Sequence, residues 1–240
     1  MTATLLSQEL LLAVRSDKPV EPLLSALGNL SGNALINDLT GINERKSFWL
    51  NIYNSFLQIK LQHAQPALNR FVKRIRFFSK KNILIAGQHL SLNDIEHGIL
   101  RNSSIWWSMG HLRKINPSSF EKLQRVHLDY RIHFALNCGA SSCPPITFYQ
   151  PHRLDTQLNE AMYAFLESDI VFNHDHSQAM VSAIFKWYKA DFGGTAGIVR
   201  LISNHFQLKN PHKLRITYKP YDWHIRPKYF APFITTNTVH

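Results

Sequence analysis

At 240 residues, with 45% hydrophobic and 12% aromatic residues, the chain is long enough to bury one substantial core. Two cysteines are too few for a disulfide-stapled scaffold, and no apolar run approaches the roughly 18 residues of a membrane helix. The N-terminal residues lack the pattern of a signal peptide, so we expect a cytoplasmic protein. No repeat, low-complexity segment or linker divides the sequence, which predicts a single domain over residues 1–240.

The formal net charge of +11 favours anionic partners wherever that charge is clustered. The one dense run covers residues 70–81, where basic residues alternate with Phe71, Phe77 and Phe78. Such a run forms either the solvated basic face of a helix or strand, which we favour, or a phosphate-tracking surface with stacking rings. Nucleic acid is therefore not the expected partner.

Helices are predicted first over residues 5–14 and 22–30, and then over residues 46–62, where apolar side chains recur at three- and four-residue steps. Within the last of these, Asn51 and Asn54 lie three apart and share one helix face. Asparagine is a poor helix-interior residue, so both side chains either bond something specific, a substrate in our interpretation, or face water.

Two short strands around a glycine turn are predicted over residues 82–92, followed by a helix that begins near Asp94. That helix carries Glu96, His97 and Arg101. Neighbouring residues on an α-helix point about 100° apart, so Glu96 and His97 are not expected to pair with each other. An acid, an imidazole and a guanidinium within six residues mark a candidate functional segment.

The remaining sequence predicts a mainly helical α+β domain with a small antiparallel sheet. His133 lies in the apolar run 131–137, which we interpret as a buried strand. The polar turn 174–176, His-Asp-His, is typical of either a solvated loop, which we favour, or part of a metal site. The other predicted elements are a loop over 103–119, a helical turn over 120–127, helices over 155–168 and 197–206, and strands over 180–184 and 214–218.

Residues 129–146 hold both cysteines, Cys138 and Cys143, separated by four small residues. A cysteine nucleophile needs a thiolate, an imidazole that keeps it ionised and a group that orients the imidazole. His133 and His97 are candidates for the imidazole and Glu96 for the orienting acid. Backbone N–H groups of the loop, around Ser141 and Ser142, are candidates for an oxyanion site.

Three other interpretations of the cysteines remain open at this point. The spacing suits two zinc ligands, with His133 and either His97 or His127 completing a tetrahedral site. The two thiols are also close enough in sequence for a redox-sensitive disulfide, or they are inert buried side chains. The residues alone do not choose which thiol would attack.

Five separated blocks resemble, in order, the signatures of the domain-of-unknown-function family 547. They span most of residues 45–226, leaving 1–44 as an N-terminal helical extension. The resemblance implies a papain-like or transglutaminase-like fold and thiol chemistry in a permuted order. Residues 224–226 depart from the family pattern, and the export signal of many bacterial members is missing. The blocks are 48–54 (FWLNIYN), 90–101 (LSLNDIEHGILR), 132–146 (IHFALNCGASSCPPI), 184–194 (IFKWYKADFGG) and 218–226 (YKPYDWHIR).

The leading hypothesis is a thiol-dependent hydrolase or acyl transferase that acts on an amide or peptide bond, without a cofactor or resident metal. Cys138 or Cys143 is the nucleophile and His133 or His97 the base, with Glu96 as orienting residue. The resemblance carries Asn51, Asn54 and Arg101 into the site, and we assign these, with Ser141 and Ser142, to substrate binding. The alternatives are a non-catalytic module that binds a protein or an anionic ligand, and a zinc-binding protein that uses the cysteine loop.

Overall fold

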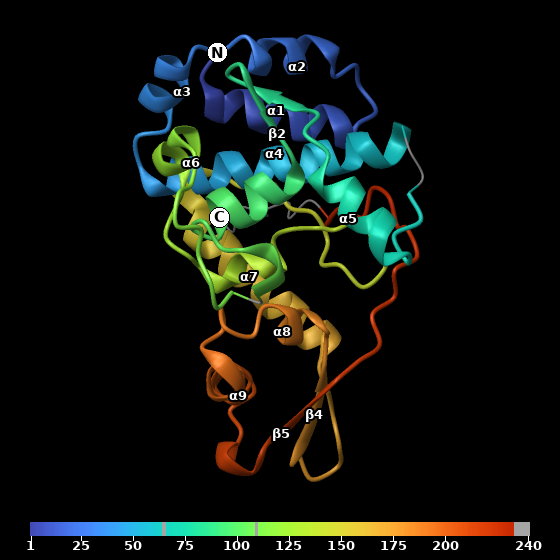
Figure 1. Ribbon diagram of the computed structural model, residues 1–240. Helices are drawn as coiled ribbons and strands as arrows, with labels where there is room; N and C mark the ends of the chain where they lie inside the picture. The colour runs from blue at the N-terminus through green and yellow to red at the C-terminus, as the bar shows by residue number, and fades with distance from the viewer. Residues whose placement is uncertain (64–65, 109, 233–240) are drawn as a thin grey trace, which may run out of the picture.

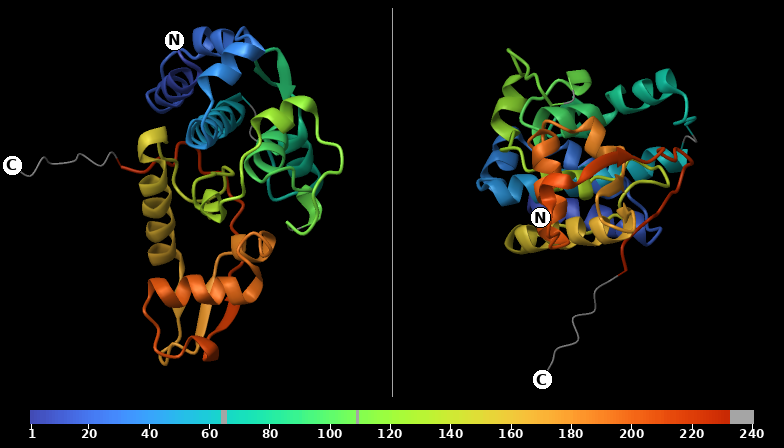
Figure 2. Two further views of the ribbon diagram at one scale, coloured as in Figure 1. Left: turned by 90° about the vertical axis from the view of Figure 1, so that its left-hand side faces the viewer. Right: turned by 90° about the horizontal axis from the view of Figure 1, so that it is seen from below.

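The computed structural model describes residues 1–63, 66–108 and 110–232, and Figure 1 shows two regions of the molecule stacked on one another. The upper region holds α1 (Ala3–Arg15), α2 (Glu21–Gly28), α3 (Gly32–Asp38), α4 (Ile42–His63), α5 (Phe71–Ser79) and α6 (Ser119–Gln124). The lower region holds α8 (Ile184–Trp187), α9 (Gly194–His205) and a small sheet. The helix α7 (Leu154–Asp169) runs alongside both, as the left view of Figure 2 shows.

Each region has its own cluster of buried apolar side chains, and α7 belongs to both. Leu154 and Leu158 from its first half join the upper cluster, which is built on α1 and α4. Phe165 and Leu166 from its second half join the lower cluster, which is built on α8, α9 and the sheet. The helix predicted over residues 155–168 is therefore confirmed, and its buried side chains are divided between two cores.

The central element of the upper region is α4, which is buried without a break from Lys46 to Leu61. A helix that is covered on all sides must bury polar side chains as well as apolar ones, and each buried polar group then needs a partner. The sequence predicted the extent of this helix well. It did not predict that the helix has no solvated face along most of its length.

Two small sheets complete the fold. In the upper region β1 (Ile83–Ile85) and β2 (Gln88–Leu90) form the predicted hairpin, whose turn residues Ala86 and Gly87 have φ of 49° and 72°. In the lower region the strand order is β3 (Val171–Phe172), β4 (Gln178–Val181) and β5 (Arg215–Tyr218). The central strand β4 pairs antiparallel with β3, as expected, but parallel with β5.

After β5, residues 219–231 return to the upper region, and we call this stretch the C-terminal segment. Figure 1 shows it in red along the right-hand edge. It pairs with the cysteine loop, residues 138–143, through a bridge between Ala140 and Ile225. A second bridge joins Ile146 to Phe230. Two stretches far apart in sequence therefore form one wall of the molecule.

The strand predicted over residues 131–137 is wrong. Tyr130–Phe134 form a 3-10 helix, η3, which begins where the side chain of Asp129 accepts a hydrogen bond from the backbone N–H of Arg131. Residues 103–119 contain a second short 3-10 helix, η2 (Trp106–Ser108). Two more are η4 (Pro151–Arg153) and η5 (Pro211–Lys213). Within the part of the chain that the structure describes, no helix combines the length and apolar character needed to cross a bilayer.

Candidate functional site

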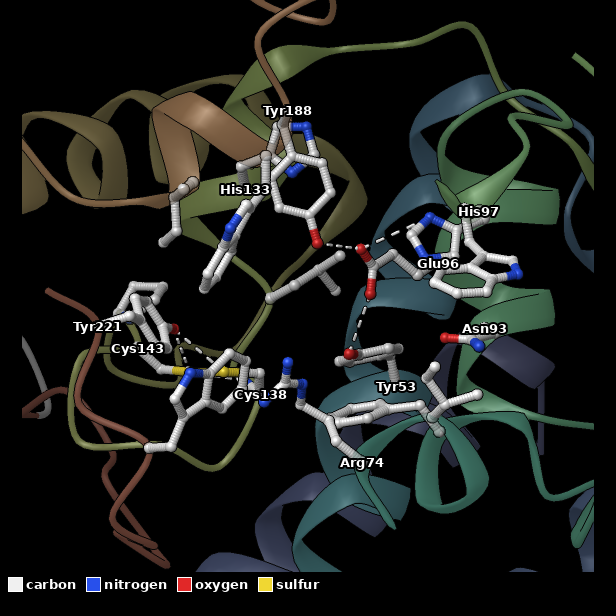
Figure 3. Close-up of a pocket in the computed structure, with 18 of the residues that line it drawn as sticks. Tyr53, Arg74, Asn93, Glu96, His97, His133, Cys138, Cys143, Tyr188 and Tyr221 are labelled. Carbon is white, nitrogen blue, oxygen red and sulfur yellow. Dashed lines mark hydrogen bonds and ion pairs between the residues drawn. A yellow bond between two sulfur atoms is a disulfide. The ribbon is translucent and has the colours of Figure 1, made fainter. Parts of the chain in front are cut away.

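A cavity of about 300 Å³, which we call the cleft, opens between the upper and lower regions (Figure 3). Its polar lining includes Glu96, His97 and His133, and both cysteines line it as well. Aromatic side chains cover much of the remaining wall. They come from α4, α5, η2, α8 and the C-terminal segment: Tyr53, Phe71, Phe78, Trp106, Trp187, Tyr188, Tyr221 and Trp223.

Glu96 and His97 lie on η1 (Asp94–Leu100), which is a π-helix and not the α-helix that the sequence predicts. The backbone N–H of Arg101 donates to the carbonyl of Glu96, five residues earlier, at 2.8 Å. Because neighbouring side chains diverge less on this wider turn, His97 Nδ1 lies 3.7 Å from Glu96 Oε1. The two side chains therefore lie closer than an α-helix would place them, but with the pKa of His97 lowered to about 4 this contact is not an ion pair near pH 7.

The carboxylate of Glu96 is held by two tyrosine hydroxyls. Tyr188 donates to Oε1 at 2.6 Å and Tyr53 donates to Oε2 at 3.1 Å, so the two oxygens are bonded from opposite sides. Burial by itself raises the pKa of Glu96, but His97, the Tyr188 hydroxyl and Arg101 outweigh it and leave the pKa lowered. Glu96 is thus an anion in the wall of the cleft.

Arg101, fully buried, joins His97 to Asp191. Its Nε donates to Asp191 Oδ2 at 2.6 Å, and its Nη1 lies 2.7 Å from His97 Nδ1. Arginine only donates, so His97 Nδ1 accepts and its proton sits on Nε2. Burial lowers the pKa of His97 to about 4, so this imidazole is neutral near pH 7.

His133 projects from η3 and shares the same aspartate. Its Nε2 lies 2.8 Å from Asp191 Oδ2, so Nε2–H donates and Nδ1 keeps its lone pair. The ring of Tyr188 stacks on the imidazole at 3.9 Å between centroids, which fixes the ring plane. Burial lowers the pKa of His133, although Asp191 opposes the shift. For Asp191, burial is outweighed by His133 and Arg101, and the pKa falls to about 2.

The two cysteines form a disulfide, with their Cα atoms 6.1 Å apart. Tyr221 Oη contacts both sulfurs, at 3.1 Å from Cys138 Sγ and 3.2 Å from Cys143 Sγ. The backbone N–H of Cys138 donates to Cys143 Sγ at 2.9 Å. Of the interpretations left open by the sequence, the disulfide is the one that the structure contains. In the described part of the chain, the hydrogen-bond partners of these sulfurs are Tyr221 and Cys138, not an imidazole.

Two of the loop amides predicted as an oxyanion site, those of Ser141 and Ser142, are occupied. Ser141 N–H donates to His224 O at 2.8 Å, and Ser142 N–H donates to Asp222 O at 3.4 Å. The serine hydroxyls also bond this segment, Ser141 Oγ donating to His224 O and Ser142 Oγ accepting from Asp222 N–H. Ser141 and Ser142 therefore hold the C-terminal segment against the loop, and neither lines the cleft.

Asn51 and Asn54 bond backbone, and neither side chain is exposed. Asn51 donates to Tyr149 O at 2.9 Å and accepts from Tyr149 N–H at 3.0 Å. Asn54 donates to Ala135 O and accepts from Asn137 N–H, both at 3.0 Å. Each amide thus replaces a strand partner for a segment beside the cysteine loop. The amide oxygen and nitrogen of both side chains, which the predicted substrate-binding role would need, are therefore already bonded to backbone.

The structure places Cys138, Cys143, His133, His97 and Glu96, all candidates from the sequence, around one cleft. It changes one role, because Asp191 and not Glu96 contacts the imidazole of His133. Arg101 lies behind the site, bonded to His97 and Asp191. Sequence reasoning missed Asp191, Tyr53, Tyr188 and Tyr221. The only signal was that all four stand in signature blocks, Tyr53 in the first, Tyr188 and Asp191 in the fourth and Tyr221 in the fifth.

Neither metal interpretation is supported. Both sulfurs of the predicted zinc set are in the disulfide, which leaves no free cysteine thiolate for a metal in the described residues. His174 and His176 lie in the exposed turn between β3 and β4, and His176 stacks on Phe172. Over the described ranges, no three His, Cys, Asp or Glu side chains are grouped to hold a metal ion.

Comparison with known proteins gives a family and no activity. The model of the family described as "Protein of unknown function, DUF547" matches residues 36–166. The match covers the first three signature blocks, which contain η1 and the cysteine loop, and it confirms the resemblance seen in the sequence. No curated protein and no solved structure matches the chain significantly.

Proposed function

The chain belongs to DUF547, a family of proteins of unknown function, and we propose that its cleft is the active site of a thiol-dependent hydrolase or acyl transferase. The bond attacked is an amide or peptide bond. The observation that carries the proposal is the His133–Asp191 pair, which lines the same cleft as the cysteine pair and leaves Nδ1 of the imidazole free to accept a proton.

The disulfide makes the form seen in the structure the inactive one, since only a thiolate attacks a carbonyl carbon. An external thiol, such as a cellular dithiol, must first attack Cys138, which is the more exposed of the two cysteines. The S–S bond breaks and Cys143 leaves as the thiolate. A second external thiol then displaces the first from Cys138, so that the reductant becomes a disulfide and the protein a dithiol.

We assign the nucleophile to Cys143 because its sulfur has two donors. The N–H of Cys138 and the hydroxyl of Tyr221 both reach it, and such donors favour the charged form of a thiol. With the Ser141 and Ser142 amides occupied, the Tyr221 hydroxyl, 3.2 Å from Cys143 Sγ, is a candidate donor for an oxyanion. The role that the sequence assigned to loop N–H groups therefore passes to a side chain from the C-terminal segment.

The reaction then follows the usual order for acyl transfer. Cys143 Sγ gives its proton to His133 Nδ1 and attacks the carbonyl carbon, and the C–N bond breaks as His133 returns the proton to the leaving amine. Water, losing a proton to His133, splits the thioester and restores the thiol. An amine in place of water gives acyl transfer.

Glu96 acts through Tyr188 as a positioning residue. Its carboxylate accepts the Tyr188 hydroxyl at 2.6 Å, and the ring of Tyr188 stacks on His133. Removing the carboxylate frees the tyrosine and, with it, one face of the imidazole. Glu96→Leu, which leaves Tyr188 without this acceptor, is therefore expected to lower the turnover more than the affinity for substrate, because it disturbs proton transfer and not binding.

Labelling with iodoacetamide at pH 6 tests the proposal without a known substrate. Protein reduced with a dithiol and then desalted should label at one cysteine at least about ten times faster than free cysteine, whose pKa of about 8.5 leaves little thiolate at this pH. Peptide mapping should place the label on Cys143, and Tyr221→Phe should slow it while Tyr218→Phe does not. If both thiols react no faster than free cysteine, the catalytic proposal fails.

Single-cysteine variants separate the two sulfur roles. Cys138→Ser should react with the probe without prior reduction, since no disulfide can form, whereas Cys143→Ser should lose the fast reaction. The opposite pattern would move the nucleophile to Cys138.

A non-catalytic binding module is the second candidate, and one observation favours it. The sulfurs contact Tyr221 and not an imidazole, so the disulfide also fits a structural role, in which it closes the cysteine loop against Tyr221 of the C-terminal segment. In that case the reduced protein would lose stability without gaining a reactive thiolate. Thermal unfolding of the reduced protein, measured beside the labelling experiment, distinguishes the two candidates.

A further inference from the structure

Two prongs of exposed apolar side chains stand on either side of the cleft. One is the start of α5, where Phe71 is 59% and Val72 76% exposed. The other is the loop after η1, residues 101–108 and 110–118, where Trp107 is 60% and Ile115 94% exposed. Phe71 of the first prong and Trp106 of the second both line the cleft, so the prongs flank its mouth.

The right view of Figure 2 shows α5 and the loop after η1 projecting on the same side of the molecule. Large apolar side chains that stand out singly are not a groove for a peptide, which needs a continuous pocket or a sheet edge. Such side chains fit a partner whose surface is flat and deformable. Tryptophan and phenylalanine are the side chains that partition into the headgroup region of a bilayer.

The charge around these prongs is positive. Four exposed basic side chains lie on α5 or directly next to it, Arg70, Lys73, Arg76 and Lys80, and the loop after η1 carries Arg113. The acidic groups that face them are engaged, because Asp94 bonds Ser91 and lies 4.0 Å from Lys81, and Glu121 pairs with Lys114 at 2.8 Å. The basic run from the sequence is therefore a solvated helix face, as we favoured, but it adjoins exposed aromatic side chains.

We propose that this face, formed by α5 and the loop after η1, docks on an anionic lipid surface with the mouth of the cleft toward the membrane. The proposal does not depend on any activity of the cleft. Apolar prongs enter the headgroup layer, while the basic side chains of α5 lie against lipid phosphate and carboxylate groups. Either set alone gives weak binding, and together they supply the two signals that stable peripheral attachment needs.

Co-sedimentation with vesicles measures the partition. Vesicles of phosphatidylcholine with about a third phosphatidylserine should bind the protein, and phosphatidylcholine alone should bind it far more weakly. Each basic residue near an anionic surface strengthens the partition about fivefold, so Lys73→Gln, Arg76→Gln and Lys80→Gln together should weaken it roughly 100-fold. The matched triple Lys209→Gln, Lys213→Gln and Arg215→Gln, also exposed but on the lower region, should change it little.

The apolar prongs and the orientation have separate tests. Trp107→Ser with Ile115→Ser should reduce binding at least tenfold, while Val171→Ser with Met180→Ser, which are 51% and 40% exposed on the lower sheet, should not. Lipids brominated on their acyl chains should quench tryptophan fluorescence, and the double variant Trp106→Phe, Trp107→Phe should remove that quenching.

Three results would overturn the proposal. One is equal binding to neutral and anionic vesicles, and another is quenching that persists without Trp106 and Trp107. The third is stronger binding to polyglutamate or to an oligonucleotide than to anionic vesicles at the same salt concentration, which would assign the face to an acidic polymer and not to a membrane.

Discussion

Replacing Asn54 by alanine tests whether this amide supports the structure or meets a substrate. The side chain donates to Ala135 O and accepts from Asn137 N–H, both at 3.0 Å, in a place with no exposure to water. Alanine leaves one carbonyl and one N–H buried without partners. Each orphaned group costs about 1–3 kcal/mol, which predicts a loss of roughly 2–6 kcal/mol in the free energy of unfolding.

The effect should also reach the cysteine loop, because the lost contacts fix residues 135 and 137, immediately before Cys138. For a chain of this length a loss of ~4 kcal/mol lowers the melting temperature by roughly 8–16 °C. Urea unfolding at constant m value gives the free energy, and hydrogen exchange at Asn137 N–H reports the local opening. Asn116→Ala, at an exposed asparagine, is the matched control and should stay within about 0.5 kcal/mol.

Asn51→Ala should behave like Asn54→Ala, since its two bonds to Tyr149 have the same geometry. The reasoning is refuted if Asn54→Ala changes the unfolding free energy by less than about 1 kcal/mol. A loss of ligand binding or turnover at unchanged stability would return both residues to the substrate-binding role that the sequence suggested.

Three further predictions concern the polar network behind the cleft. Because the pKa of His97 is lowered to about 4, the unfolded chain binds a proton at this residue before the folded chain does as the pH falls. The free energy of unfolding should therefore be full above about pH 6.5 and fall as the pH drops toward 4. NMR of the imidazole should show no titration of His97 between pH 5.5 and 8, and a midpoint near 6.5 would contradict the prediction. Arg101→Met should lower the free energy of unfolding in urea by about 3–5 kcal/mol, because Asp191 loses a buried partner. The double variant Arg101→Met, Asp191→Asn should lose less than the sum of the two single changes, and additive losses would contradict the coupling. Gly110→Ala should destabilise the protein far more than Gly87→Ala. Both glycines have positive φ, but a Cβ at Gly110 meets Asp191 Oδ1 at 2.3 Å, whereas the space around Gly87 is open. Equal decreases in melting temperature for the two variants would contradict the prediction.

Much of the helical framework could be predicted because its signals are local. The periodic apolar side chains of α1 and α7 and the glycine turn between β1 and β2 each lie within one short stretch of sequence. Residues 131–137 misled because a short apolar run fits a buried strand and a buried helical turn equally well. The π-helix η1 has no sequence signature of its own, so the approach of His97 to Glu96 could not be foreseen.

The residue types of the site could be predicted, but their pairing could not. Cys138, Cys143, His133 and Glu96 were found because thiol chemistry needs those types. Asp191 stands 58 positions after His133, in a stretch with no catalytic pattern, and only packing of the lower region against the upper one brings it to the imidazole. The cytoplasmic location and the papain-like or transglutaminase-like relationship stay predictions.

The C-terminal segment has a consequence for the order in which the molecule is made. Ser142 and Asp222, which bond each other, are 80 positions apart, so on the ribosome the cysteine loop emerges well before its partner has been synthesised. During that interval the loop amides lack the acceptors that His224 and Asp222 later provide, and both sulfurs lack the Tyr221 hydroxyl. The nascent thiols are therefore open to oxidants, alkylating agents and folding catalysts at a stage when the finished cleft does not yet exist.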